Sequence, residues 1–114
     1  MPLCRITTNS QLQDAKALST KASATVAELL SKPLSYVMTI VTHNESMTLG
    51  GTDEPAAYVH IGSIGSVGGD KNKPIVAGIT DLLAAELGVK PARICVAVQE
   101  IDRTELAFNG TTLA

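Results

Sequence analysis

The chain has 114 residues, the usual size of one domain, and its 45% hydrophobic residues can build a core. A formal net charge of −2, with no run of basic residues and no aromatic-basic interleaving, argues against a nucleic-acid-binding protein. No apolar run is long enough to span a membrane, and the N-terminus lacks a signal-peptide pattern. We therefore expect a cytoplasmic protein that acts away from membranes.

The two cysteines and two histidines predict neither a disulfide framework nor a metal site. Cys4 and Cys95 are far apart and flanked by strand-forming residues, which is typical of buried small hydrophobic residues. His43 and His60 each lack a second ligand at metal-binding spacing. We expect no metal and no cofactor.

An internal repeat organises the chain. The segment KPLSYVMTIV at 32–41 aligns with KPARICVAVQ at 90–99, at an offset of 58 residues, and each follows a helix-like stretch. The repeat predicts one domain over 1–114 made of two pseudo-repeats, at about 2–42 and 58–100. Each pseudo-repeat is predicted to form a strand, a helix and a second strand.

The first helix is predicted to begin at a capping box formed by Ser10 and Gln13 and to end at Pro33. Its apolar residues recur at helical spacing: Leu12, Ala15, Leu18, Ala22, Val26, Leu29 and Leu30. This pattern predicts a helix with one face in the core.

The second helix is predicted to begin at Asp70, an N-cap that follows two glycines, with Pro74 in its first turn. Gly88 is the expected C-terminal cap. The apolar stripe comprises Ile75, Ile79, Leu82, Leu83 and Leu87.

Strand-forming segments precede and follow each helix. They are LCRIT, YVMTIVT, YVHIGSIG and ICVAV, with short extra strands expected near MTLGG and ELAFN. Strands joined by a helix in this way run parallel with a right-handed crossover. The predicted fold class is therefore α/β (α+β): a four-stranded mixed sheet with two helices on one face.

The other sheet face is predicted to be apolar as well. Tyr36, Met38 and Ile40 point to one side of their segment, while Val37 and Val41 point to the other. Two helices cover only one face, and a bare apolar face of this size is rare on a monomer. We therefore expect an obligate oligomer in which copies of the chain cover the second face.

Several segments together resemble the macrophage migration inhibitory factor and D-dopachrome tautomerase family. They are MPLCRITTN, the Lys-Pro pair at 32–33 followed by Tyr36, LGGTDEPAA, HIGSIGSVGG and FNGTTLA, which span the chain from end to end. The resemblance implies a homotrimer and an N-terminal proline that acts as the base in keto-enol tautomerisation.

The chemistry of that reaction suits Pro2. Removal of Met1 would leave Pro2 with a free secondary amine, and tautomerisation needs a base that is neutral near pH 7. A chain-terminal amine titrates at roughly 7.7–8, and an apolar pocket or a nearby cation lowers that value. Pro2 is the expected general base and acid of the reaction.

The resemblance also assigns substrate-binding positions. Lys32 matches the cation that holds the substrate carboxylate, and the backbone N–H of Ile64 matches a second contact to the same group. Ser63, Tyr36 and Phe108 match pocket positions. Lys90 has the same local sequence as Lys32 but matches no such position.

Two positions depart from the family pattern. Cys95 and Ala97 stand where the best-known members have a tyrosine and an asparagine from the adjacent subunit. Neither side chain can donate a strong hydrogen bond to the substrate, so these two substrate-binding positions put rate and substrate preference in question.

The sequence thus predicts a homotrimeric keto-enol tautomerase for phenylpyruvate-like or dopachrome-like α-keto acids. A non-catalytic binding or signalling trimer, with an unknown receptor, is the alternative. Hydration or dehalogenation of unsaturated acids is a third reading, which usually requires pocket arginines and an extra carboxylate. Neither Arg5 nor Arg93 has an evident pocket role in the sequence.

Overall fold

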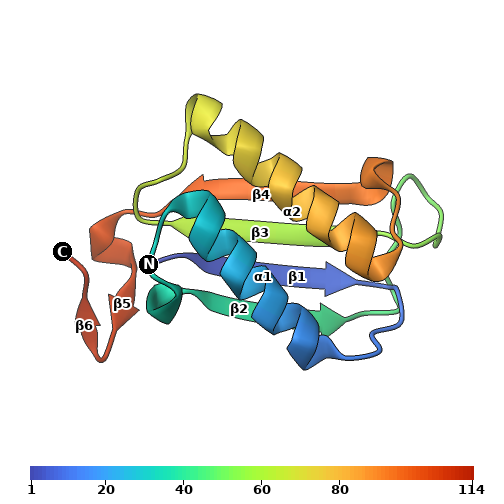
Figure 1. Ribbon diagram of the computed structural model, residues 1–114, viewed down its shortest axis with the longest axis horizontal. Helices are drawn as coiled ribbons and strands as arrows, with labels where there is room; N and C mark the ends of the chain where they lie inside the picture. The colour runs from blue at the N-terminus through green and yellow to red at the C-terminus, as the bar shows by residue number, and fades with distance from the viewer.

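The computed structural model describes residues 1–114 and contains one four-stranded sheet with two helices on the same face (Figure 1). The elements are β1 (Leu3–Thr8), α1 (Ala15–Leu30), β2 (Met38–His43), β3 (Ala57–Ser63), α2 (Asn72–Leu87), β4 (Ile94–Glu100), β5 (Ala107–Phe108) and β6 (Thr111–Thr112). The strand order is β2-β1-β3-β4. The predicted fold class is confirmed.

The sheet joins two parallel strand pairs through an antiparallel centre. β1 pairs with β2 in parallel, β3 pairs with β4 in parallel, and β1 and β3 run antiparallel. Each parallel pair is connected by the helix that follows its first strand, as expected for β-α-β units. Antiparallel pairing of β1 and β3 makes Leu3 the partner of Gly62 near the end of the sheet where the chain begins.

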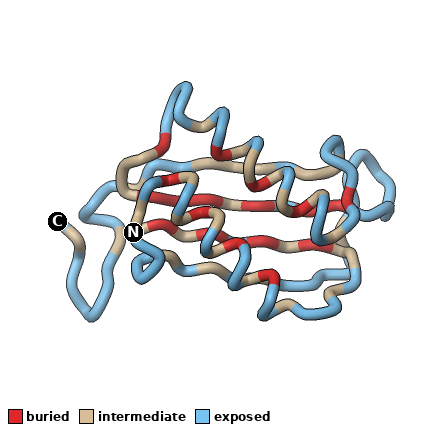
Figure 2. Tube along the Cα trace, in the orientation of Figure 1, coloured by how far each residue is buried: buried red, intermediate tan, exposed pale blue.

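The core lies between the sheet and the helices, where buried residues follow β1, β3 and the inner sides of α1 and α2 (Figure 2). Ile6, Val59 and Ile61 of the central strands are fully buried there. The helices pack closely at Gly78, where an added Cβ would lie 2.8 Å from the terminal carbons of Leu29. Gly78 thus permits the contact between the helices.

The first helix begins later than the capping-box prediction placed it. Asp14 is its N-cap, with the carboxylate accepting a hydrogen bond of 3.0 Å from the Ala17 N–H. Ser10 precedes the helix, and its own N–H donates to the Thr8 hydroxyl instead. The helix ends before Pro33, at Ser31, which adopts the left-handed conformation. The predicted capping box is therefore wrong.

The second helix also begins differently from the prediction. Asp70 lies in a short 3-10 helix, and no side chain caps α2. The Asn72 side chain instead accepts a hydrogen bond from the Gly68 N–H. Pro74 lies in the first turn and Gly88 ends the helix in the left-handed conformation, so both of these predictions are confirmed.

Two smaller predictions need correction. The MTLGG segment contributes only an isolated bridge between Leu49 and Thr52, not a strand. Cys4 is buried, which raises the pKa of its thiol to about 12, but Cys95 is exposed on β4. The expected burial is thus right for Cys4 and wrong for Cys95, because β4 turns that side chain away from the helices.

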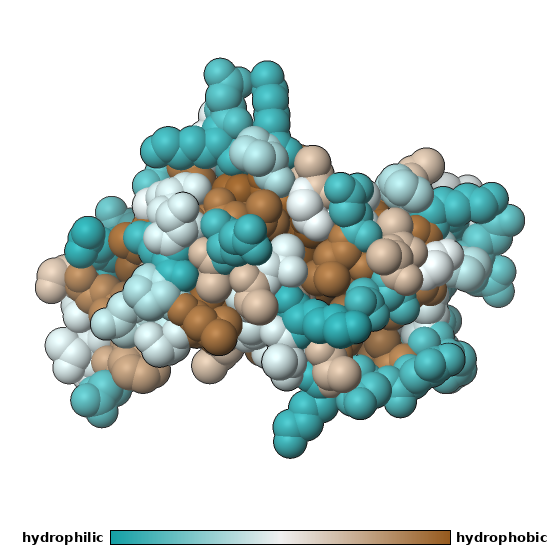
Figure 3. Space-filling view, viewed as in Figure 1, coloured by the Kyte–Doolittle hydropathy of each residue, from teal (hydrophilic) through white to brown (hydrophobic).

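The sheet face opposite the helices is open and carries large apolar side chains. Met38, Ile40 and Tyr58 are 52%, 46% and 37% exposed, while Val37 and Val41 pack against the core as expected. The helix-bearing face has hydrophilic side chains around its rim and hydrophobic ones in its centre (Figure 3). None of the helices combines the length and hydropathy needed to cross a membrane.

Candidate active site

A mostly apolar cavity of about 400 Å³ opens at the end of the sheet where the chain begins. Its walls come from four separate parts of the chain: Met1, Lys32, Pro33, Tyr36, Ile64, Arg103, Phe108 and Leu113. Four of the residues proposed from the sequence therefore meet here, namely Lys32, Tyr36, Ile64 and Phe108.

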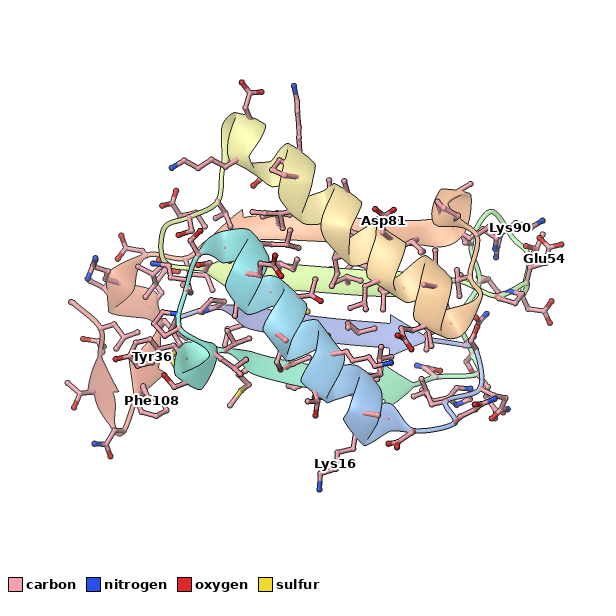
Figure 4. The ribbon with its side chains drawn as sticks, viewed as in Figure 1. Lys16, Tyr36, Glu54, Asp81, Lys90 and Phe108 are labelled. Atoms are coloured by element: carbon pink, nitrogen blue, oxygen red, sulfur yellow. The ribbon has the colours of Figure 1, made fainter.

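The end of α1 positions Lys32 and Tyr36. The Lys32 N–H donates to the Ala27 carbonyl at 2.9 Å as the helix closes, and Pro33 then turns the chain into a 3-10 helix over Leu34–Tyr36. Tyr36 is the last residue of that turn. Figure 4 shows its ring near Phe108 of the C-terminal hairpin, at the end of the molecule opposite Lys90. Both rings are more than half exposed in the single chain.

Pro2 lies just behind the cavity, one residue before β1. Its ring is fully buried, and its carbonyl accepts a hydrogen bond of 3.0 Å from the Met38 N–H. Met1 projects from it into the cavity wall. The pKa of the Met1 amine lies below its ordinary value because burial disfavours the charged form, and the Lys32 and Arg103 charges add to this.

Ser63 is buried beside this end of β1. Because Leu3 pairs with Gly62 in the antiparallel register, the next positions along the two strands are Pro2 and Ser63. The Ser63 hydroxyl is the one buried side-chain polar atom without a hydrogen-bond partner. It lies behind the cavity wall, whereas the following residue, Ile64, is part of that wall.

The two positions that depart from the family pattern lie elsewhere. Cys95 and Ala97 belong to β4 and point away from the helices, since the alternate residues Ile94, Val96 and Val98 pack against the core. They are not part of the cavity formed by their own chain.

Arg103 is a cavity residue that sequence reasoning missed. It begins a 3-10 helix over Arg103–Glu105, which is capped by the Asp102 carboxylate. The arginines considered from sequence lie elsewhere: Arg5 lines a hollow on the open sheet face, and Arg93 donates to backbone carbonyls at the far end of the molecule. No local motif marks Arg103, because only the folded chain brings residues 101–113 beside Lys32.

A second, more polar hollow of about 600 Å³ adjoins the first. Lys32, Ile64 and Arg103 line both, and the second adds Gly65, Glu100, Ile101 and Asp102. Its two carboxylates and two cations balance in formal charge. By contrast, no carboxylate lines the apolar cavity, so its lining carries two positive charges from Lys32 and Arg103.

The cavity combines a chain terminus, two cations and apolar walls. A terminal amine with a lowered pKa can act as a base near neutral pH, and a cation beside it can hold an anionic substrate. No group of three or more histidine, cysteine or carboxylate side chains is arranged to hold a metal ion. The geometry thus defines an α+β protein with a candidate acid-base site at its N-terminus.

Comparison with known proteins identifies the family. The family model described as macrophage migration inhibitory factor matches residues 1–114, so the chain belongs to that family. A curated macrophage migration inhibitory factor homolog from Brugia malayi is 37% identical over 113 residues, covering 98% of both chains. A homolog from Trichuris trichiura is 31% identical over 98% of this chain and 99% of its own.

Solved structures of this family have the same fold as this chain. A macrophage migration inhibitory factor homologue from Prochlorococcus marinus has a TM-score of 0.93 and 30% identity, covering 98% of this chain and 99% of its own. The macrophage migration inhibitory factor from Trichinella spiralis has a TM-score of 0.91 and 29% identity over 96% and 98% of the two chains. The resemblance found in the sequence is confirmed.

Proposed function

We propose that the protein is a keto-enol tautomerase for phenylpyruvate-like α-keto acids, with Pro2 as the acid-base group once Met1 is removed. The observation that carries the proposal is the position of the chain terminus: it opens into an apolar cavity beside Lys32 and Arg103. Membership of a family that includes tautomerases supports the same reading.

The proposed reaction moves one proton. In the ketonisation direction, a general base takes the proton of the enol hydroxyl as the carbonyl forms, and a proton is delivered to the adjacent carbon. The neutral Pro2 amine is that base, and once protonated it delivers the same proton to carbon, so that it is neutral again at the end. The reverse reaction takes the proton from carbon and returns it to oxygen. Burial and the Lys32 and Arg103 charges lower the pKa of the Met1 amine at this site, and the same surroundings would favour the neutral form of a Pro2 amine.

Lys32 is the proposed anchor of the substrate carboxylate. It lines the cavity, and its charge acts on the chain-terminal amine, so a carboxylate bound there would lie close to the base. The Ile64 N–H is proposed as a second donor to the same group. The aromatic walls at Tyr36 and Phe108 suit a planar apolar substrate body.

A homotrimer is part of the proposal. The exposed Met38 and Ile40 on the open sheet face supply an apolar surface that a second copy of the chain would cover. In such an assembly, Cys95 and Ala97 on the same face of β4 would contribute to the cavity of a neighbouring copy. Sedimentation at several protein concentrations tests the assembly.

The test of the mechanism has two parts. Mass spectrometry of the purified protein should show a mass that lacks Met1, since a retained Met1 makes the Pro2 nitrogen an amide without basicity. The Pro2→Gly variant should then lose enol-keto conversion of phenylpyruvate while keeping its assembly. Undiminished turnover by that variant would contradict the mechanism.

The alternative proposal is a non-catalytic binding trimer. Met1 is part of the cavity wall, so a retained Met1 would occupy part of the site and leave the Pro2 nitrogen as a non-basic amide. Complete retention of Met1, together with turnover no faster than the uncatalysed reaction, would favour this alternative.

A further inference from the structure

Lys32 and Arg103 give the cavity one more positive charge than a single carboxylate needs. The other residues of the wall have uncharged side chains: Met1, Pro33, Tyr36, Ile64, Phe108 and Leu113. Arg103 is exposed in the single chain and Lys32 is half-buried, so the two charges favour anionic ligands by electrostatic attraction and not because they are buried without a partner. The second positive charge therefore bears on how many anionic groups the substrate carries.

Arg103 has no partner of its own. It takes part in no salt bridge, and its side chain makes no hydrogen bond. The neighbouring Asp102 carboxylate accepts hydrogen bonds from the Thr104 hydroxyl and N–H instead, and these bonds hold its pKa below the ordinary value. The guanidinium is left with all of its donors, in the planar arrangement that suits a carboxylate.

The backbone around Arg103 is tied to the rest of the fold. The Ile101 N–H donates to the Ser63 carbonyl at 2.8 Å, which fixes the segment beside β3. The Asp102 side chain caps the following turn, and the Leu113 N–H donates to the Leu106 carbonyl at 3.0 Å. Arg103 thus extends from an anchored backbone, and its side chain lines the cavity.

The arrangement of charges favours an anion in the apolar cavity over one in the adjoining hollow. Glu100 and Asp102 line that hollow and would repel an anion there. Arg103 borders both spaces, and its charge adds to the effects of burial and of Lys32 that lower the pKa of the Met1 amine. A ligand with one anionic group at Lys32 and another at Arg103 would satisfy both cations.

We infer that Arg103 binds a second anionic group of the substrate, so that the site prefers α-keto acids with a further carboxylate over monocarboxylic ones. The inference rests on the proposed tautomerase function and specifies its substrate class. Arg103 is then a specificity-determining residue: it holds the end of the substrate away from the carboxylate at Lys32.

The test compares phenylpyruvate with 4-carboxyphenylpyruvate in the Met1-free protein and in Arg103→Gln. Measurements are made at a pH where the rate no longer rises, so that a change in the amine pKa does not contribute. We expect the wild type to show the higher kcat/KM for the diacid. Arg103→Gln should lower the diacid value by about 10–100-fold, as expected for a lost charge-assisted bond, and the monoacid value by only a few-fold.

Two further variants serve as controls. Arg103→Lys keeps the charge without the planar fork and should retain part of the preference. Lys16→Gln removes one positive charge from an exposed position far from Tyr36 and Phe108 (Figure 4), and should leave the ratio of the two substrates unchanged. Circular dichroism and sedimentation establish that each variant is folded and assembled.

The outcomes are distinguishable. Equal losses for both substrates in Arg103→Gln, or no wild-type preference for the diacid, would overturn the inference while leaving the tautomerase proposal intact. If the wild type converts neither substrate, the proposed function fails, and binding of terephthalate against benzoate by NMR then tests Arg103 directly. Tighter terephthalate binding that Arg103→Gln abolishes would support the inference, and equal binding of both acids would overturn it.

Discussion

The two pseudo-repeats end their helices in the same way but have different surroundings. Lys32 and Pro33 lead into a 3-10 helix before β2, and Lys90 and Pro91 lead into a 3-10 helix before β4. At the first of these ends the chain terminus and the C-terminal hairpin enclose a cavity of about 400 Å³. At the second, a smaller hollow of about 120 Å³ is lined by Glu54, Pro55, Gly88, Lys90 and Arg93.

The last residue of each 3-10 helix shows the contrast most clearly. Tyr36 lines the apolar cavity, whereas Arg93 fills the equivalent space with hydrogen bonds to the carbonyls of Pro55 and Glu54, at 2.9 and 3.0 Å. Glu54 and Lys90 lie together at that end of the molecule (Figure 4). The same local structure therefore borders an apolar cavity in the first repeat and a loop in the second, depending on which other parts of the chain lie beside it.

The largest expected effect comes from blocking the free Pro2 amine, because only the first repeat contains the chain terminus. A Gly-Ser extension ahead of Pro2 converts its nitrogen to an amide, and loss of a positioned base typically costs about 10²–10⁴-fold in rate. We expect phenylpyruvate turnover to fall by at least 100-fold, with sedimentation unchanged. The control is the same dipeptide added after Ala114, which should leave turnover as it was.

The next largest effect on kcat/KM is expected from Lys32, which is compared with Lys90, the matching lysine of the second repeat. Lys32→Gln removes the proposed carboxylate anchor and should lower kcat/KM for phenylpyruvate by about 10–100-fold, the usual cost of a hydrogen bond to a charged group. Lys90→Gln removes the matching lysine from the second repeat and should have no measurable effect. Equal losses in both variants would mean that the repeats do not differ in function.

The pH dependence should separate the same two lysines. The neutral amine is the proposed base, so kcat/KM should rise with pH and level off above the pKa of that amine. Burial and the two cations lower the pKa of the Met1 amine, and we expect the same surroundings to lower the pKa of a Pro2 amine and so to move the rise to lower pH. Lys32→Gln should return the rise toward higher pH, and Lys90→Gln should not move it. A rise at the same pH in all three proteins would contradict a charge effect of Lys32 on the base.

The helices and main strands could be predicted from the sequence, because each has a local pattern of apolar residues. Strand composition and helical spacing placed β1 to β4 and both helices, and the apolar residues on both sides of β2 predicted the open face at Met38 and Ile40. The core-facing residues of the two repeats match at an offset of 57 residues, because Val37 takes the position of Ile94. The two Lys-Pro pairs, in contrast, align at an offset of 58 residues. The first repeat therefore has one more residue between Lys32 and Val37 than the second has between Lys90 and Ile94.

The parts that sequence reasoning missed depend on tertiary contacts. Arg103 reaches the cavity because a hydrogen bond from Ile101 to Ser63 holds its segment beside β3, and no spacing in the sequence encodes that contact. Asp14 is the N-cap of α1, whereas the S-x-x-Q pattern of Ser10 and Gln13 predicts a cap four residues earlier. Cys95 sits in an apolar strand, so its exposure depends on which way the strand faces.

The smallest expected effect is on stability and compares the N-terminal caps of the two helices. Asp14 caps α1 through the Ala17 N–H, and loss of such a cap typically costs about 1 kcal/mol of unfolding free energy. Asp70 caps nothing and forms only an exposed ion pair with Lys73, so Asp70→Ala should have no measurable effect. Urea unfolding at one fixed protein concentration compares the variants, because an assembled protein gains stability with concentration. Equal midpoints for Asp14→Ala and the wild type would mean that α1 is held by its packing alone, as α2 is.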